Sequence, residues 1–233
     1  LFLAMGSCNT ETDLGIFEGN MDIGNVGHPG SVVFNSSDSS YAVSGSGTNM
    51  WFDTDEFHYV WKEVSGDIFL AADIEWIGEG LDAHRKACLI IRQDLDTASV
   101  YVDVAVHGDG LTSMQYRDTP GGMTSEVQSN VTGPVRVGIE KRGDYYSMFV
   151  ADKDKALSFA GGSFKLSITE PFYFGLGLSA HNNDAIETAI FSNLMITNPE
   201  QKADSEMKVQ STLETIDIAS FDRRVVYHTD SHI

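Results

Sequence analysis

The chain has 233 residues, 42% of them hydrophobic and 10% aromatic, which is enough for the core of one large domain and excludes a wholly disordered chain. Its 15 lysines and arginines against 34 aspartates and glutamates give a formal net charge of −19, which argues against a nucleic acid partner. With 22 glycines and 5 prolines, the composition suits a β-rich domain with many glycine turns.

The first segment combines apolar residues, small residues and a cysteine. Residues 5–8 read Met-Gly-Ser-Cys, and the polar stretch 9–13 follows them. This pattern resembles a bacterial lipobox, which implies that Cys8 is lipidated and that the protein is exported, in the periplasm or anchored to the outer membrane. We expect residues 1–13 to be a signal remnant and polar tether, and membrane contact only through the lipid. An ordinary turn of small residues is the alternative.

Residues 14–198 consist of short β-prone runs separated by glycine, aspartate, asparagine and serine. In the run 68–76, apolar residues occupy every second position, and Asp73 and Glu75 fall between them. Such alternation predicts a strand with one face in a core and the other in solvent.

A second run, 100–107, sets four valines against Tyr101, Asp103 and His107. We expect the valines to face a core and the other side chains to face outward, so that the strand is covered on one side only.

Glycine-containing turns link further runs of this kind. Residues 106–111 and 142–145 are expected hairpins, and 172–178 interleaves glycines with large apolar residues, as where another backbone packs closely. About a dozen strands on this pattern predict an all-β fold, a jelly-roll sandwich of two antiparallel sheets.

The composition changes after this region. Residues 199–210 are polar and are expected to be a linker, and a new apolar pattern begins at 211. The remaining stretch, 211–233, is too short to build a core of its own.

Two resemblances refine this outline. Landmarks in 41–51, 55–61, 65–67 and 87–93 resemble the concanavalin A-like domains of unknown function related to the regulation-of-enolase group, over about residues 17–197. The resemblance implies a concanavalin A-like sandwich, but the family has no single settled activity. Residues 211–233 are similar to the first blade of a TolB-like propeller and stop before its later part.

The polar and aromatic side chains expected on one sheet face form a candidate sugar site. Sugars pack their C–H faces on aromatic rings and pair their hydroxyls with planar donors and acceptors. The candidate ligand-binding residues are His58, Arg92, Tyr101, Asp103, His107, Gln115 and Arg117.

Structural roles compete with ligand binding at several of these positions. The whole set could be a solvated face with cross-strand charge pairs. Arg92 ends an apolar run, where pairing with a buried carboxylate is the competing role. His58 lies between two aromatic residues, where a satisfied structural histidine is the usual finding.

A glycoside hydrolase is the enzymatic alternative. Asp73 and Glu75 stand two residues apart on one strand face, roughly the separation that a retaining enzyme needs. Their order is reversed relative to the sandwich-fold glucanases. A group formed by His58, Arg92 and His107 is the other expected source of acid-base chemistry.

No cofactor is expected. Calcium is the alternative, because aspartates cluster in 53–56, 94–96 and 152–154, but none follows an EF-hand pattern and such aspartates usually form turns. The seven scattered histidines do not suggest zinc. Cys88 lies in an apolar run and is expected to be an inert core thiol.

These observations favour a non-catalytic, lectin-like domain of an exported lipoprotein that binds or scaffolds a carbohydrate or glycan polymer. A sugar-active hydrolase and a spacer for a downstream propeller remain as alternatives.

Overall fold

Alternating apolar residues form fourteen strands in the computed structural model, which describes residues 13–134, 136–153 and 155–198. Within these residues no helix occurs, and so none is long and apolar enough to span a membrane. The predicted lipidation residue Cys8, the linker 199–210 and the propeller-like segment 211–233 lie outside the described residues.

The strands pair into two seven-stranded sheets, and every pairing between them is antiparallel. Sheet A contains, in spatial order, β1 (Gly19–Ile23), β4 (Phe57–Val64), β13 (Phe172–Ser179), β6 (Lys86–Arg92), β7 (Tyr101–His107), β8 (Thr112–Arg117) and β9 (Ser125–Gln128).

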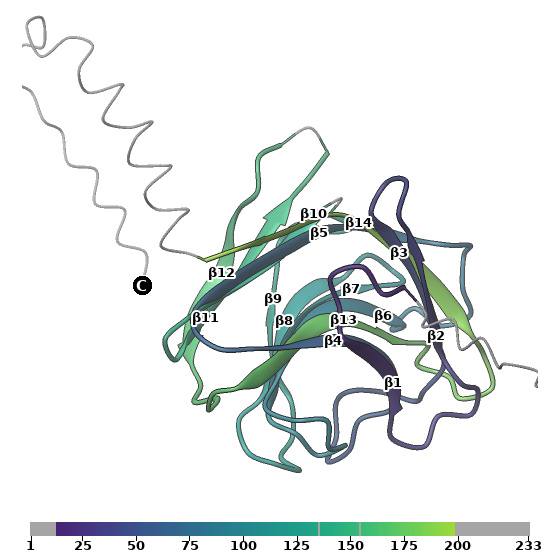
Figure 1. Ribbon diagram of the computed structural model, residues 1–233, viewed down its shortest axis with the longest axis horizontal. Helices are drawn as coiled ribbons and strands as arrows, with labels where there is room; N and C mark the ends of the chain where they lie inside the picture. Colours follow the sequence, from purple (N-terminus) through teal and green to yellow (C-terminus); the bar gives the residue numbers. More distant parts are fainter. Residues whose placement is uncertain (1–12, 135, 154, 199–233) are drawn as a thin grey trace, which may run out of the picture.

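Sheet B contains, in spatial order, β12 (Ser158–Lys165), β11 (Tyr145–Ala151), β10 (Arg136–Arg142), β5 (Ile68–Trp76), β14 (Glu187–Thr197), β3 (Ser40–Gly45) and β2 (Ser31–Asn35). Figure 1 shows the two sheets as stacked layers, with sheet B arching over sheet A. The expected all-β jelly-roll sandwich of two antiparallel sheets is confirmed.

The hydrophobic core fills the space between the layers. Alternate residues of β5, among them Leu70 and Ala72, meet Val102 and Val104 of β7 in one cluster of buried side chains. Asp73 and Glu75 point away from that core, as the alternation predicted.

Glycines act where the chain turns or where strands approach closely. Gly143, with φ of 55°, is the first of two residues that join β10 to β11, which confirms the hairpin expected at 142–145. In β13, a Cβ atom on Gly175 would overlap the backbone oxygen of Val60 on β4. This approach explains the interleaved glycines of that strand.

The prediction that β7 is covered on one side only is wrong. All seven of its residues are buried, because its second face is also covered. The cover includes residues 46–56, which connect β3 to β4 and place Met50 in a second apolar cluster with Tyr59 and Tyr101.

Candidate functional site

The outer face of sheet A, meaning the face turned away from sheet B, carries most of the predicted site. Side chains alternate along each strand, and register sets the outward residues of neighbouring strands side by side. Six of the seven predicted ligand-binding residues share this face: Arg92, Tyr101, Asp103, His107, Gln115 and Arg117.

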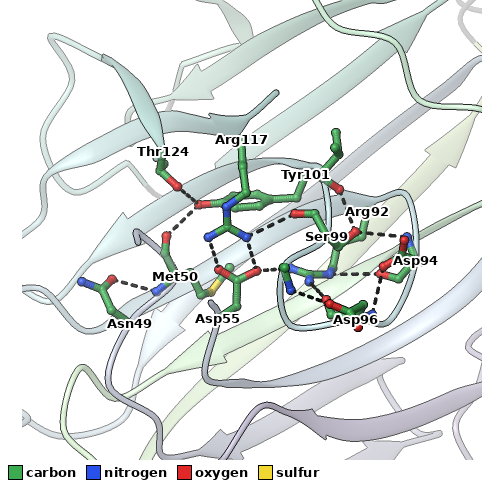
Figure 2. A network of polar contacts seen from close by, with 12 residues as sticks. Asn49, Met50, Asp55, Arg92, Asp94, Asp96, Ser99, Tyr101, Arg117 and Thr124 are labelled. Carbon is green, nitrogen blue, oxygen red and sulfur yellow. Dashed lines mark hydrogen bonds and ion pairs between the residues drawn. The ribbon is translucent and has the colours of Figure 1, made fainter. Parts of the chain in front are cut away.

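One end of the outer face is locked by a buried carboxylate between two guanidinium groups. Asp55 Oδ2 accepts hydrogen bonds from Nη1 of Arg92 at 2.7 Å and Nη1 of Arg117 at 2.9 Å, and its Oδ1 accepts from Nη2 of Arg117 at 2.7 Å. All three side chains have no exposed area. Figure 2 shows this group, which we call the Asp55 lock.

The same guanidinium groups also hold the surrounding loops. Arg92 donates to the backbone oxygens of Asp94 and Asp96, at 3.3 and 2.6 Å. Arg117 donates to three backbone oxygens, those of Phe52, Ser99 and Gly122. These bonds tie the segments before β4, between β6 and β7, and after β8 to one end of sheet A.

Tyr101 completes the locked end. Its hydroxyl lies 2.6 Å from the backbone oxygen of Met50, to which it donates, and 2.8 Å from the hydroxyl of Thr124. Its ring lies between the two guanidinium groups, whose central carbons are 5.8 Å (Arg92) and 5.0 Å (Arg117) from the ring centroid.

The expected exposure of Arg92, Tyr101 and Arg117 is therefore wrong. Every guanidinium nitrogen of the two arginines already donates to an internal acceptor, and all three side chains are fully buried. The alternative expectation for Arg92, that it pairs with a buried carboxylate, agrees with its contact to Asp55.

The other end of the outer face opens into a cleft of about 370 Å³. Two predicted residues, His107 and Gln115, line it. The remaining lining residues were not predicted: Asn49, Trp51, Phe52, His84, Lys86, Leu111, Glu126, Gln128 and His181. Alternation along β6 and β9 could have predicted that Lys86, Glu126 and Gln128 lie on the outer face.

Asn49 organises one wall of the cleft. Its Oδ1 accepts a hydrogen bond from Nζ of Lys86 at 2.9 Å, and its Nδ2 lies 3.1 Å from Nε2 of His181. The Lys86 ammonium is 5.2 Å from the ring centroid of Trp51. Burial lowers the pKa of Lys86, and the nearby carboxyl of Asp103 opposes this shift.

Gln115 organises the opposite wall. Its Nε2 lies 3.3 Å from Oε1 of Glu126, 3.2 Å from Oγ of Ser113 and 3.4 Å from Nε2 of His107. Burial disfavours the Glu126 carboxylate, but hydrogen bonds from Gln128 and Gln115 keep its pKa below the usual value. This wall therefore presents amide groups beside a carboxylate.

Three imidazoles stand at the cleft. The His84 ring lies 6.3 Å from that of His107 and 5.6 Å from that of His181. His107 Nδ1 donates to the backbone oxygen of Leu111 at 2.9 Å, so its Nε2 is an acceptor in the neutral ring. Burial lowers the pKa of His107 to about 4, and the ring is neutral at neutral pH.

Asp103 on β7 lies directly opposite Gln115 on β8 and is fully buried. Within residues 13–134, 136–153 and 155–198, neither of its carboxyl oxygens has a hydrogen-bond partner. Oε1 of Gln115, the residue paired with it across β7 and β8, has none there either. Loss of hydration raises the pKa of Asp103 to about 8.

His58 does not join the site. It shares its strand face with Val60 on the core side of sheet A and is packed against Gly30 and Gly45. Its Nδ1 lies 2.8 Å from Oδ1 of Asp22. Burial lowers the pKa of His58 although Asp22 opposes the shift, and this environment matches the structural role weighed for it above.

Asp73 and Glu75, the alternative catalytic pair, lie on the outer face of sheet B. Asp73 is bound by Nη1 of Arg136 and Nδ2 of Asn193, both at 2.6 Å. The two carboxylates border a separate hollow of about 610 Å³.

The aspartate clusters weighed as calcium ligands have other contacts. Asp55 belongs to the lock, Asp94 and Asp96 accept hydrogen bonds from backbone N–H groups two residues ahead, and Asp152 is paired with Lys155. Across the described residues, no three histidine, cysteine, aspartate or glutamate side chains are grouped to hold a metal. Cys88 is buried among apolar side chains, and burial raises the pKa of its thiol.

No family model and no curated protein matches the chain. Among solved structures, the fold is similar to that of a functionally unknown protein from Saccharomyces cerevisiae, with a TM-score of 0.56 and 12% identity over 72% of this chain and 92% of that one.

Two carbohydrate-active proteins are also among the similar structures. Alginate lyase A1-II′, a member of polysaccharide lyase family 7, has a TM-score of 0.47 at 8% identity, covering 72% of this chain and 82% of its own. The GH43 protein BlXynB from Bacillus licheniformis has a TM-score of 0.49 at 9% identity, covering 69% of this chain and 33% of its own. At such identities the comparisons concern the fold, and the sandwich is the architecture that this chain shares with the yeast protein.

Proposed function

We propose that the cleft on the outer face of sheet A binds a carbohydrate, and that the protein is a non-catalytic, lectin-like binding or scaffolding domain. The observation that carries this proposal is the lining of one cleft by the rings of Trp51 and Phe52 together with the amides of Gln115 and Gln128 and the carboxylate of Glu126. Aromatic faces and planar hydrogen-bonding groups are complementary to a sugar ring.

The size of the cleft supports a short segment of a glycan. Its volume of about 370 Å³ lies near the lower end of the range for small-molecule sites. Phe52, with 55% of its surface exposed, borders the cleft and offers an aromatic surface on which a longer chain could continue.

Calorimetric titration with cellohexaose, xylohexaose and an oligouronate of similar length tests the proposal. We expect at least one of them to bind, and Trp51→Ala to weaken that binding by about tenfold or more, because it removes the stacking surface. The control is Phe159→Ala, which removes an aromatic residue that is 54% exposed on strand β12 of sheet B and should leave affinity unchanged. No binding by any of the three, or equal affinity in both variants, would contradict the proposal.

A sugar-active hydrolase is the second candidate. It is favoured by the neutral His107 imidazole, whose acceptor nitrogen lies at the cleft beside Gln115. Such a ring is unprotonated at neutral pH and can act as a weak general base toward a bound hydroxyl. Turnover of an oligosaccharide that disappears in His107→Ala while binding persists would favour this candidate over the first.

We further propose export and lipidation at Cys8, on the evidence of residues 5–8 alone, and kinship with the regulation-of-enolase group of domains, on the landmarks in 41–67 and 87–93. Incorporation of a labelled fatty acid that Cys8→Ser abolishes would support the lipid anchor. The spacer role stays a proposal that depends on a propeller following 211–233.

A further inference from the structure

Asp103 and Gln115 combine three buried acceptor oxygens that lack donors. They are directly paired across β7 and β8 on the same face, and both are fully buried. Directly opposite residues have Cβ atoms about 5 Å apart, so their side chains are within reach of each other. Oδ1 and Oδ2 of Asp103 and Oε1 of Gln115 are all without a partner. Three such oxygens in one place call for a hydrogen-bond donor.

The orientation of the Gln115 amide follows from its other neighbours. Oε1 of Glu126, 3.3 Å away, can only accept, because hydrogen bonds hold the pKa of this carboxyl low. Nε2 of His107 is also an acceptor, since Nδ1 of that ring donates to Leu111. The NH₂ group of Gln115 must therefore point toward these two acceptors, and its carbonyl oxygen points away from them.

Among the described residues, no cation forms an ion pair with Asp103. The ammonium of Lys86 donates to Asn49, and no ion pair joins Lys86 to Asp103. The backbone N–H of Gln115 lies near the carboxyl and favours its ionised form, but its geometry to Oδ1 and Oδ2 does not meet that of a hydrogen bond. The titratable groups that face Asp103 from the packed elements are Lys86 and Cys88 on β6, Tyr101 on β7, Asp55 in the covering segment and Glu126 on β9.

We propose that Asp103 is a positioning residue that stays a neutral carboxylic acid and donates its O–H to Oε1 of Gln115. A directed chain of hydrogen bonds then runs from Asp103 through the Gln115 amide to Glu126 and His107, and it holds the amide that lines the cleft. Loss of the Asp103 proton removes the donor to the Gln115 carbonyl, for which the described part of the chain offers no replacement, and leaves two acceptors facing each other.

Burial accounts for the neutral form. Loss of hydration is the largest contribution, Lys86 offsets part of it, and the pKa of Asp103 is raised to about 8. The acid is therefore protonated at neutral pH and titrates in the mildly alkaline range. For the cleft, and resting on the proposed carbohydrate binding, this predicts that affinity falls as the pH rises through about 8.

Side-chain NMR tests the proposal without any ligand. We expect a carboxyl ¹³C resonance that is absent in Asp103→Asn and titrates with a midpoint near pH 8, and Gln115 side-chain amide resonances that shift with the same midpoint. In Asp103→Asn, whose amide donates permanently, the Gln115 resonances should not shift in this range. A carboxyl midpoint below about pH 5, or Gln115 resonances that do not shift between about pH 7 and pH 9, would overturn the proposal.

Thermal unfolding gives the second readout. A folded-state pKa above the unfolded value stabilises the protein at low pH, and this contribution is lost as the pH rises toward about 8. The Tm of Asp103→Asn relative to the natural protein should therefore rise by several degrees between about pH 5 and about pH 8. Asp118→Asn, at an exposed aspartate after β8, should show no such change. A loss of Tm at neutral pH in Asp103→Asn would indicate an ionised, paired Asp103 instead.

The binding arm separates the two proposals. If one of the three oligosaccharides binds, its affinity should decline through about pH 8 in the natural protein and stay level in Asp103→Asn. If none binds, the proposed function fails, whereas the NMR and unfolding results still decide the state of Asp103.

Discussion

Two buried aspartates on one side of the same sheet have opposite environments. Asp55 accepts three hydrogen bonds from the guanidinium groups of Arg92 and Arg117, whereas both oxygens of Asp103 lack a donor. Burial alone therefore does not decide the state of a carboxyl group. Where guanidinium groups donate to a buried carboxyl group, it ties loops together. Where no group donates to it, burial favours the neutral acid.

The two ends of the outer face differ in the same way. At the locked end, arginines, a tyrosine and an aspartate bind each other and backbone oxygens, and their side chains have no exposed area for a partner. At the cleft end, aromatic rings and amides border open space. Residue types that suggest ligand binding can thus make only internal contacts that stabilise the fold, although they lie a few strand positions from a cleft.

The largest expected effect comes from breaking the lock. Asp55→Ala leaves two buried guanidinium groups without their carboxylate, which we expect to lower the free energy of unfolding by about 3–5 kcal/mol or to prevent folding. Urea unfolding of the purified protein measures the change. Asp103→Asn, compared at neutral pH, should not be destabilising, and similar losses in both variants would refute the contrast between the two aspartates.

An intermediate effect is expected when each arginine becomes lysine. Arg117 makes five hydrogen bonds and Arg92 three, and a lysine cannot reproduce their planar geometry. We expect losses of about 1–3 kcal/mol, larger for Arg117→Lys than for Arg92→Lys. The reverse order in denaturant unfolding would mean that the number of anchored carbonyl groups does not set the strength of the lock.

The smallest effect is expected at an exposed pair of the same chemistry. Asp73 and Arg136 lie on the outer face of sheet B, with 34% and 21% of their side chains exposed. Solvent screens such pairs, so Asp73→Asn should cost at most about 1 kcal/mol in the same unfolding measurement. A loss as large as that of Asp55→Ala would show that burial is not what distinguishes the two pairs.

Most of the fold could be predicted from local patterns. The alternation in 68–76 and 100–107 correctly assigned the core residues of β5 and β7, and glycine turns located the hairpins at 106–111 and 142–145. These features depend on neighbouring residues, because strand periodicity and turn geometry are local properties.

The site was predictable only in part. Alternation placed Tyr101, Asp103 and His107 on the correct face but could not show that residues 46–56 cover one end of it. It also could not show that Asp55 would reach Arg92 and Arg117, which are 37 and 62 positions away in the chain. Such contacts depend on how loops return to the sheet, for which period-two patterns carry no signal.

By itself, the sequence determined which side chains enter the space between two sheets, since the two-residue period of a strand assigns each residue to a face. Only the tertiary structure decided which outward residues remain available. At one end of sheet A, the buried carboxylate of a covering loop binds both arginines. At the other end, the register of β6, β7, β8 and β9 brings four side chains to a cleft: Lys86, His107, Gln115 and Glu126. The physical reason is that segments distant in the sequence decide which side chains are buried and paired, whereas the alternation of adjacent residues along a strand decides which sheet face a side chain occupies.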